Sequence, residues 1–198
     1  MYDIFLLTLK YKCNYITKWK NDLNIDDHTI KGLNCVVFRS TSDVRLRWLQ
    51  YRITHRILAT NKFLHNIGLK DSPLCTFCKK ENETLLHLFI TCEHVHSLWS
   101  KLEEWIYNKV GILLNFSTKD LLFGKPGKKC VSQNIIVYIV KSYIYKQRLN
   151  NETLYLTSVK KMLRYYYNLE KYIFYSNCKF QKFSDRWKAI DKLFDDQT

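Results

Sequence analysis

Four metal-binding side chains within eighteen residues constrain the fold of this chain more than any other feature of its sequence. Cys75 and Cys78 are separated by two residues, His87 follows after eight more, and Cys92 after a further four. Thiolates and imidazoles at comparable spacings form tetrahedral structural zinc sites, in which four protein side chains fill every position around the ion. The sequence therefore predicts one structural zinc ion bound by Cys75, Cys78, His87 and Cys92.

Other roles for the cysteines are less well supported. A redox Cys-x-x-Cys pair belongs in a βαβ unit, and the sequence has no sustained strand pattern. Seven cysteines, an odd number, in a chain long enough to bury a core disfavour a disulfide framework. His94 and His96 lie just beyond Cys92, and either imidazole is an alternative ligand. The scattered cysteines are predicted to be small buried apolar residues: Cys13, Cys35, Cys130 and Cys178.

Basic residues dominate both flanks of the cysteine-rich segment. The net charge is +14, with +7 over residues 1–70, +1 over 71–130 and +6 over 131–198. Basic flanks that also carry aromatic side chains suit a phosphate backbone and stacked bases. However, Lys, Asn, Ile and Tyr are all encoded by A/T-rich codons, so the composition of the genome is an alternative source of the charge.

The sequence lacks the features of membrane and secreted proteins. No apolar run reaches the roughly 18 residues of a membrane-spanning helix. The N-terminal apolar stretch at residues 4–7 is short and lacks a basic lead, unlike a signal peptide. We therefore expect an intracellular protein, in the nucleus or cytoplasm, with no membrane partner.

A helical period of apolar residues runs through most of the chain and predicts an all-α fold. A short helix is expected to begin at Glu83 and carry His87. The segment 44–66, with an interruption near Thr60, has two apolar stripes and is expected to be buried on more than one side. Long helices are predicted over residues 3–23, 44–66, 93–109, 131–149, 153–176 and 180–194, with a short helix over 28–38 and a short helical turn over 116–122.

These elements suggest an irregular helical assembly with one zinc-stapled loop in its middle. Residues 1–40 form a helical lead-in, residues 41–110 contain the Arg-rich helix and the zinc-binding segment, and residues 111–198 form a helical tail. We expect the three parts to pack as one compact unit, because 198 residues fit one or two domains.

The predicted helix that precedes the cysteines carries three arginines on one face. Arg45, Arg52 and Arg56 are separated by seven and four residues, which aligns them along a helix. Guanidinium groups bind phosphates in a bidentate geometry, although a solvated basic face is the alternative. Together with lysines near the zinc loop, the predicted nucleic-acid-binding residues are Arg45, Arg52, Arg56, Lys62, Lys79 and Lys80.

The sequence contains no recognisable catalytic site. Motifs of serine hydrolases, zinc proteases and dinucleotide-binding enzymes are absent. The Gly124-x2-Gly127-Lys128 segment lacks the spacing of a Walker motif. Asp26-Asp27 and Asp195-Asp196 lack the aromatic residue two positions earlier that marks a polymerase turn. We predict no catalytic residues, no enzymatic activity and no small-molecule substrate.

The residues around the cysteines resemble a known family. An Arg-rich stretch at 46–61 precedes the Cys-x2-Cys pair. The stretch Glu-Thr-Leu-Leu-His-Leu-Phe at 83–89 contains His87, and Leu98-Trp99 follows Cys92. This order resembles the zinc-binding segment that follows the reverse transcriptase domain of non-LTR (LINE-type) retrotransposons. The close resemblance covers about residues 45–105.

The resemblance implies zinc as the cofactor, the four ligands named above, and nucleic acid as the partner of Arg52 and Arg56. In the intact element this segment helps to hold template RNA and target DNA, beside endonuclease and polymerase domains that this sequence does not contain. We expect a fragment, a decayed copy or a reused segment that binds RNA or DNA, with a polymerase domain in trans as a further partner. A zinc-stabilised protein–protein interaction module and a non-functional relic are the alternatives.

Overall fold

The structure is a computed structural model and describes residues 14–25, 32–33 and 35–195. Within these residues the chain is helical and contains no β-strand, only an isolated antiparallel bridge between Leu74 and Asn82. The all-α prediction is therefore confirmed. No helix in the described part of the chain is long and apolar enough to cross a membrane.

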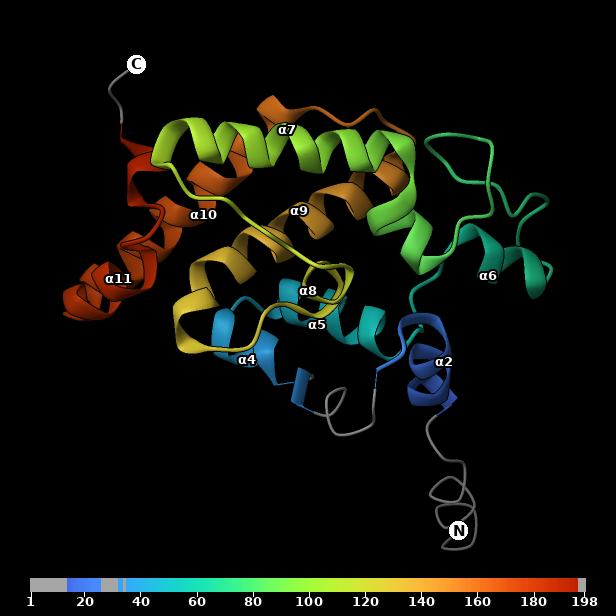
Figure 1. Ribbon diagram of the computed structural model, residues 1–198, viewed down its shortest axis with the longest axis horizontal. Helices are drawn as coiled ribbons and strands as arrows, with labels where there is room; N and C mark the ends of the chain where they lie inside the picture. The colour runs from blue at the N-terminus through green and yellow to red at the C-terminus, as the bar shows by residue number, and fades with distance from the viewer. Residues whose placement is uncertain (1–13, 26–31, 34, 196–198) are drawn as a thin grey trace, which may run out of the picture.

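The helices follow one another along the chain, and a long loop joins α6 to η1 (Figure 1). The α-helices are α2 (Asn14–Leu23), α4 (Val36–Ser40), α5 (Val44–Thr54), α6 (Asn61–Asn66), α7 (Glu93–Val110), α8 (Thr118–Phe123), α9 (Val131–Asn150), α10 (Leu156–Ser176) and α11 (Phe180–Trp187). A π-helical turn, η1 (His87–Thr91), precedes α7, and the 3-10 turns η2 (Lys128–Cys130) and η3 (Asp191–Phe194) precede α9 and follow α11.

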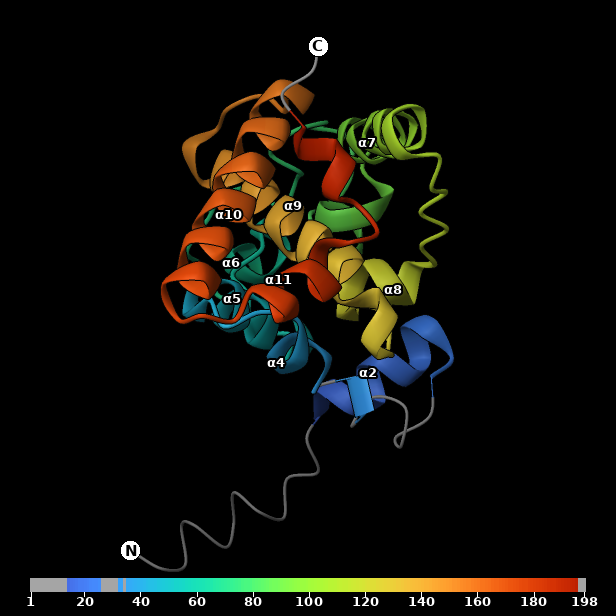
Figure 2. The ribbon, with the colours of Figure 1, turned by 90° about the vertical axis from the view of Figure 1, so that its left-hand side faces the viewer.

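Helix α9 is the centre of the fold. It contacts α4, α5, α10, α11 and η1, and it lies between α7 above and α5 below in Figure 1 and between α10 and α8 in Figure 2. Its residues 134–141 are buried without a break, so it has no solvent-facing stripe in this stretch. One apolar cluster, from Trp19 to Phe194, surrounds it. Burial of this cluster is the main driving force for the fold.

The long predicted helices at 93–109, 131–149 and 153–176 are confirmed within a few residues by α7, α9 and α10. The helix expected over 180–194 is shorter, because α11 ends at Trp187 and residues 191–194 form a 3-10 turn. Residues 3–13, 28–31 and 34 of two predicted helices lie outside the described residues. Residues 14–23 of the first form α2, and the end of the second lies in α4.

The helix expected over 44–66 is interrupted, as predicted near Thr60, but the interruption begins several residues earlier. Helix α5 ends at Thr54, and Arg56 has a φ of +57°, a left-handed conformation that cannot continue an α-helix. The helix restarts as α6 after Thr60, whose side chain accepts a hydrogen bond from the backbone N–H of Phe63 and so caps it. The interruption therefore covers residues 55–60.

The expectation that both apolar stripes of α5 are buried is also wrong. Leu46, Leu49 and Ile53 lie in the core, but Val44, Trp48 and Tyr51 are 74%, 59% and 42% exposed. Helix α5 packs against α9, α8 and α4, and these contacts leave Val44, Trp48 and Tyr51 largely exposed to solvent. The exposed stripe of α5 is thus an apolar and aromatic surface.

The prediction that the scattered cysteines are buried is wrong for those that the structure describes. Cys35 and Cys178 are exposed, and Cys130 is half-buried. Each lies at a turn or a helix end and not on a core-facing stripe: Cys35 precedes α4, Cys130 ends η2, and Cys178 has a φ of +54° after α10. Cys13 lies outside the described residues.

Candidate metal centre

The four predicted ligands converge on one point. The sulfur atoms of Cys75, Cys78 and Cys92 and a ring nitrogen of His87 all lie within 4.8 Å of one another. The two sulfurs of Cys75 and Cys92 are 3.8 Å apart, and Cys78 Sγ lies 3.3 Å from His87 Nε2. Zn–S bonds of about 2.3 Å at the tetrahedral angle place two sulfurs about 3.8 Å apart. The donor set therefore fits a tetrahedral metal ion.

A tight turn brings Cys75 and Cys78 to the site. The N–H of Cys75 donates to the carbonyl of Glu81 at 2.7 Å, and the N–H of Lys79 donates to the carbonyl of Cys75 at 3.0 Å. Lys79 has a φ of +57°, which reverses the chain directly after Cys78. The N–H of Phe77 also points to Cys75 Sγ at 3.4 Å. This hydrogen bond stabilises a thiolate at Cys75.

His87 lies on the π-helical turn η1, as the short helix expected from Glu83 suggested. Its Nε2 faces Cys78, while its Nδ1 lies 3.1 Å from Glu81 Oε2 and 3.3 Å from Thr91 Oγ1. A carboxylate on one ring nitrogen orients the imidazole and favours the tautomer in which the other nitrogen is free to bind a metal. Sequence reasoning missed Glu81, because an exposed glutamate in a loop carries no local signal.

Cys92 is the residue immediately before α7. The hydrogen bond from the Cys75 thiol to the Cys92 sulfur raises the pKa of Cys75, and burial adds to the effect. The same hydrogen bond lowers the pKa of Cys92, as do the backbone N–H groups of Val95 and His94. A dication would allow both sulfurs to ionise, so metal binding releases protons.

The alternative ligands are excluded from the cluster by their positions. His94 and His96 are both exposed on the first turns of α7, and neither belongs to the group of ligand atoms. His94 Nε2 instead lies 3.8 Å from Glu93 Oε1. Because four side chains already surround the point of convergence, the geometry leaves no place for a fifth ligand from these histidines.

A buried ion pair attaches the metal loop to the centre of the fold. Arg148 Nε, on α9, donates to Glu83 Oε1 at 2.9 Å, and Glu83 is fully buried. The same carboxylate accepts hydrogen bonds from the N–H of Asn61 at 2.9 Å and from the N–H of Thr76 at 3.0 Å. Thr76 lies between the first two ligands. The Glu83 carboxylate therefore connects the metal loop, α6 and α9.

Asn61 completes this network. Its amide nitrogen donates to the carbonyl of Leu74 at 2.6 Å, and its amide oxygen accepts from Arg148 Nη2 at 2.7 Å. It also accepts from Lys70 Nζ at 2.7 Å. Sequence reasoning placed Glu83 at a helix start and assigned Asn61 and Arg148 no role, because their partners are remote in sequence.

The three predicted arginines do not form one row. Arg45 is exposed and pairs with Asp43 at 3.1 Å, and the Arg52 guanidinium lies 5.8 Å from the centre of the Tyr145 ring. Arg56 lies beyond the end of α5 and pairs with Asp22 at 2.6 Å. The prediction that the three arginines share one helix face is therefore wrong for Arg56, which lies outside α5.

The three predicted lysines are all exposed. Lys62 lies on α6, and Lys79 and Lys80 lie on the turn after Cys78. Lys80 Nζ pairs with Glu93 Oε1 at 2.8 Å, which raises the pKa of Lys80 and lowers that of Glu93. These positions leave the assignment of the six basic residues to nucleic acid as a prediction.

Three thiolates and one imidazole in a tetrahedral arrangement are typical of zinc. Comparison with known families points to the same ion. Residues 10–99 match the family described as zinc-binding in reverse transcriptase. The matched region contains all four ligands, Glu83 and Asn61, and it ends within α7. The match supports a reverse transcriptase zinc-binding region in the first half of the chain. No curated protein matches the chain.

Proposed function

We propose that this chain is a zinc-stabilised, nucleic-acid-binding segment of a LINE-type reverse transcriptase, with no catalytic activity of its own. One zinc ion has a structural role, because four protein ligands leave no position for a reactive water. The resemblance of residues 45–105 to non-LTR elements supports the LINE origin. The proposed partner is single-stranded RNA or DNA.

A basic groove beside the metal loop is the observation that carries this proposal. It encloses about 260 Å³ between α2, α6 and the segment that leads into η1. Lys18, Arg56 and Lys62 line it, and no acidic residue does. Arg56 is partly neutralised by Asp22, but both lysines are exposed. A groove of this charge suits a phosphate backbone.

The exposed stripe of α5 supplies the second element of such an interface. The rings of Trp48 and Tyr51 are parallel within 9°, with centroids 5.4 Å apart. The exposed Arg45 and the half-buried Arg52 are on the same helix. Aromatic rings next to arginines provide stacking surfaces for bases without selecting a particular sequence.

Salt-dependent binding tests the proposal. We expect fluorescence anisotropy with labelled single-stranded RNA and DNA to show affinity that falls steeply between about 50 and 200 mM salt. The substitutions Lys18→Gln and Lys62→Gln should each reduce the slope of log K against log salt by about 0.7, the value per phosphate contact for single strands. Lys119→Gln, an exposed lysine on α8 outside the groove, is the matched control. Absence of affinity for both nucleic acids would refute the proposal.

The second candidate is a protein-docking module. The exposed apolar side chains of α5, above all Val44 and Trp48, favour it. Apolar docking depends little on salt, so binding of a purified polymerase domain that persists at high salt and is lost in Trp48→Ala would support this candidate.

A further inference from the structure

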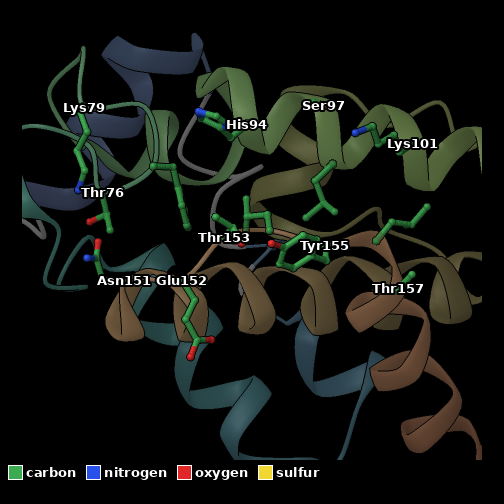
Figure 3. A pocket seen from close by; sticks show the side chains of 14 residues that line it. Thr76, Lys79, His94, Ser97, Lys101, Asn151, Glu152, Thr153, Tyr155 and Thr157 are labelled. Atoms are coloured by element: carbon green, nitrogen blue, oxygen red, sulfur yellow. The ribbon is translucent and has the colours of Figure 1, made fainter.

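A second concave surface lies on another side of the metal loop. A cavity of about 480 Å³ is enclosed by the turn between Cys75 and Lys79, the first half of α7, and the segment 151–157 that joins α9 to α10 (Figure 3). Its volume lies within the range of about 300–1,000 Å³ that is typical of ligand pockets. The basic groove described above shares no residue with it.

The charge of this cavity is positive along one wall. His94, Ser97 and Lys101 line it from α7, where intervals of three and four residues place them on one face. Figure 3 shows Lys79 near one end of this row and Lys101 at the other. Both lysines are exposed.

The single acidic side chain of the lining does not oppose these cations. Glu152 Oε2 accepts a hydrogen bond from Gln147 Nε2 at 2.9 Å, and Figure 3 shows the Glu152 carboxylate directed away from α7. A wall with lysines at both ends and no opposing carboxylate suits an extended anion.

The opposite wall presents an aromatic ring. Tyr155 is 59% exposed, and Figure 3 places it across from α7 between the two lysines. Its N–H donates to Tyr143 Oη at 2.9 Å, which holds the backbone at this point against α9. Phe77, from the metal loop, also lines the cavity. Rings opposite two exposed lysines match the bases and the backbone of a single strand.

We propose that this cavity binds a short single-stranded segment of nucleic acid, with its phosphates along Lys79, His94 and Lys101 and a base against Tyr155. The inference rests on the proposed function and names a binding surface for it. The metal contributes to this surface, since the N–H of Lys79 donates to the carbonyl of the ligand Cys75. Removal of zinc should therefore weaken binding here.

The test uses the zinc-loaded chain, labelled oligouridine and oligothymidine, and two pairs of variants. We expect Tyr155→Ala to weaken binding about fivefold or more, as loss of one stacked base does. Tyr165→Ala, an equally exposed tyrosine (59%) on α10 outside the cavity, should leave affinity unchanged. Lys101→Gln should reduce the salt slope by about 0.7, and Lys119→Gln should not. Photocrosslinking with 4-thiouridine in the oligonucleotide should label Tyr155 or its neighbours.

The outcomes separate this inference from the proposed function. If the wild-type chain binds oligonucleotides with a steep salt slope, but Tyr155→Ala and Lys101→Gln bind equally well, the cavity is refuted and the proposed function stands. If the wild-type chain shows no affinity for RNA or DNA, both are refuted. A difference between the RNA and DNA arms would identify the strand that this cavity accepts. Circular dichroism of each variant verifies that the substitutions leave the fold intact.

Discussion

The Glu83–Arg148 ion pair should make an unusually large contribution to stability. Arg148→Met removes the cation but keeps most of the side-chain volume, and it leaves the Glu83 carboxylate buried with two backbone donors as its remaining partners. The exposed fraction is 0% for Glu83 and 7% for Arg148. Removal of one member of a buried, hydrogen-bonded pair costs about 3–5 kcal/mol, because the other charge is left uncompensated.

The loss of the Arg148 cation should also weaken the metal centre. Glu83 accepts from the N–H of Thr76, between the ligands Cys75 and Cys78, so displacement of the carboxylate loosens the metal loop. We therefore expect Arg148→Met to lower both the free energy of unfolding in urea and the affinity for zinc in a chelator competition. The double variant Glu83→Gln/Arg148→Met should recover part of the stability, since it removes the buried charge.

A surface ion pair provides the matched control. Lys80 and Glu93 approach to 2.8 Å, a similar separation, but both side chains are exposed. Exposed pairs contribute little because water and salt screen them. Lys80→Met should therefore leave the urea midpoint nearly unchanged. If Arg148→Met shifts the midpoint no more than Lys80→Met does, the reasoning about the buried pair is refuted.

Two further perturbations have clear expected results. Cys78→Ser should abolish zinc binding and increase amide hydrogen exchange over residues 74–92, because three ligands no longer hold the loop closed around the ion. Unchanged protection of these amides from exchange would contradict a structural role for the metal. Lys141→Met should remove a pH dependence of stability. Burial lowers the pKa of Lys141 well below its usual value, so below about pH 10.4 the unfolded chain binds more protons than the folded chain does. The free energy of unfolding of the wild type, relative to that of the variant, should therefore rise with pH by up to about 1.4 kcal/mol per pH unit in that window. Urea titrations from pH 7 to 10 measure this difference, and parallel curves for the two proteins would contradict the effect of burial.

The metal ligands and the long helices could be predicted because their signals are local. The four ligands lie within eighteen residues, and their spacing alone indicates a tetrahedral site. Helices α7 and α10 carry apolar stripes that face the core. Even α9, which is buried on every side at its centre, could be recognised because apolar residues recur in it at helical spacing.

The remaining features depend on contacts between distant parts of the chain. The end of α5 was expected near Thr60, which is too late, because apolar residues continue at helical spacing through Ile57. The left-handed conformation of Arg56 coincides with its contacts to Asp22 and the Trp19 ring. The pairing of Glu83 with Arg148 joins residues 65 positions apart, and no local pattern predicts it. Likewise, the exposure of Trp48 depends on which elements cover α5.

The central claim is that a single zinc ion closes the loop formed by Cys75, Cys78, His87 and Cys92. Native mass spectrometry of the purified chain, with Cys75→Ser measured in parallel, tests it most directly. The account predicts the mass of one zinc ion on every folded wild-type chain and none on the variant. A wild-type chain that folds without zinc, or a variant that retains it, would contradict the account.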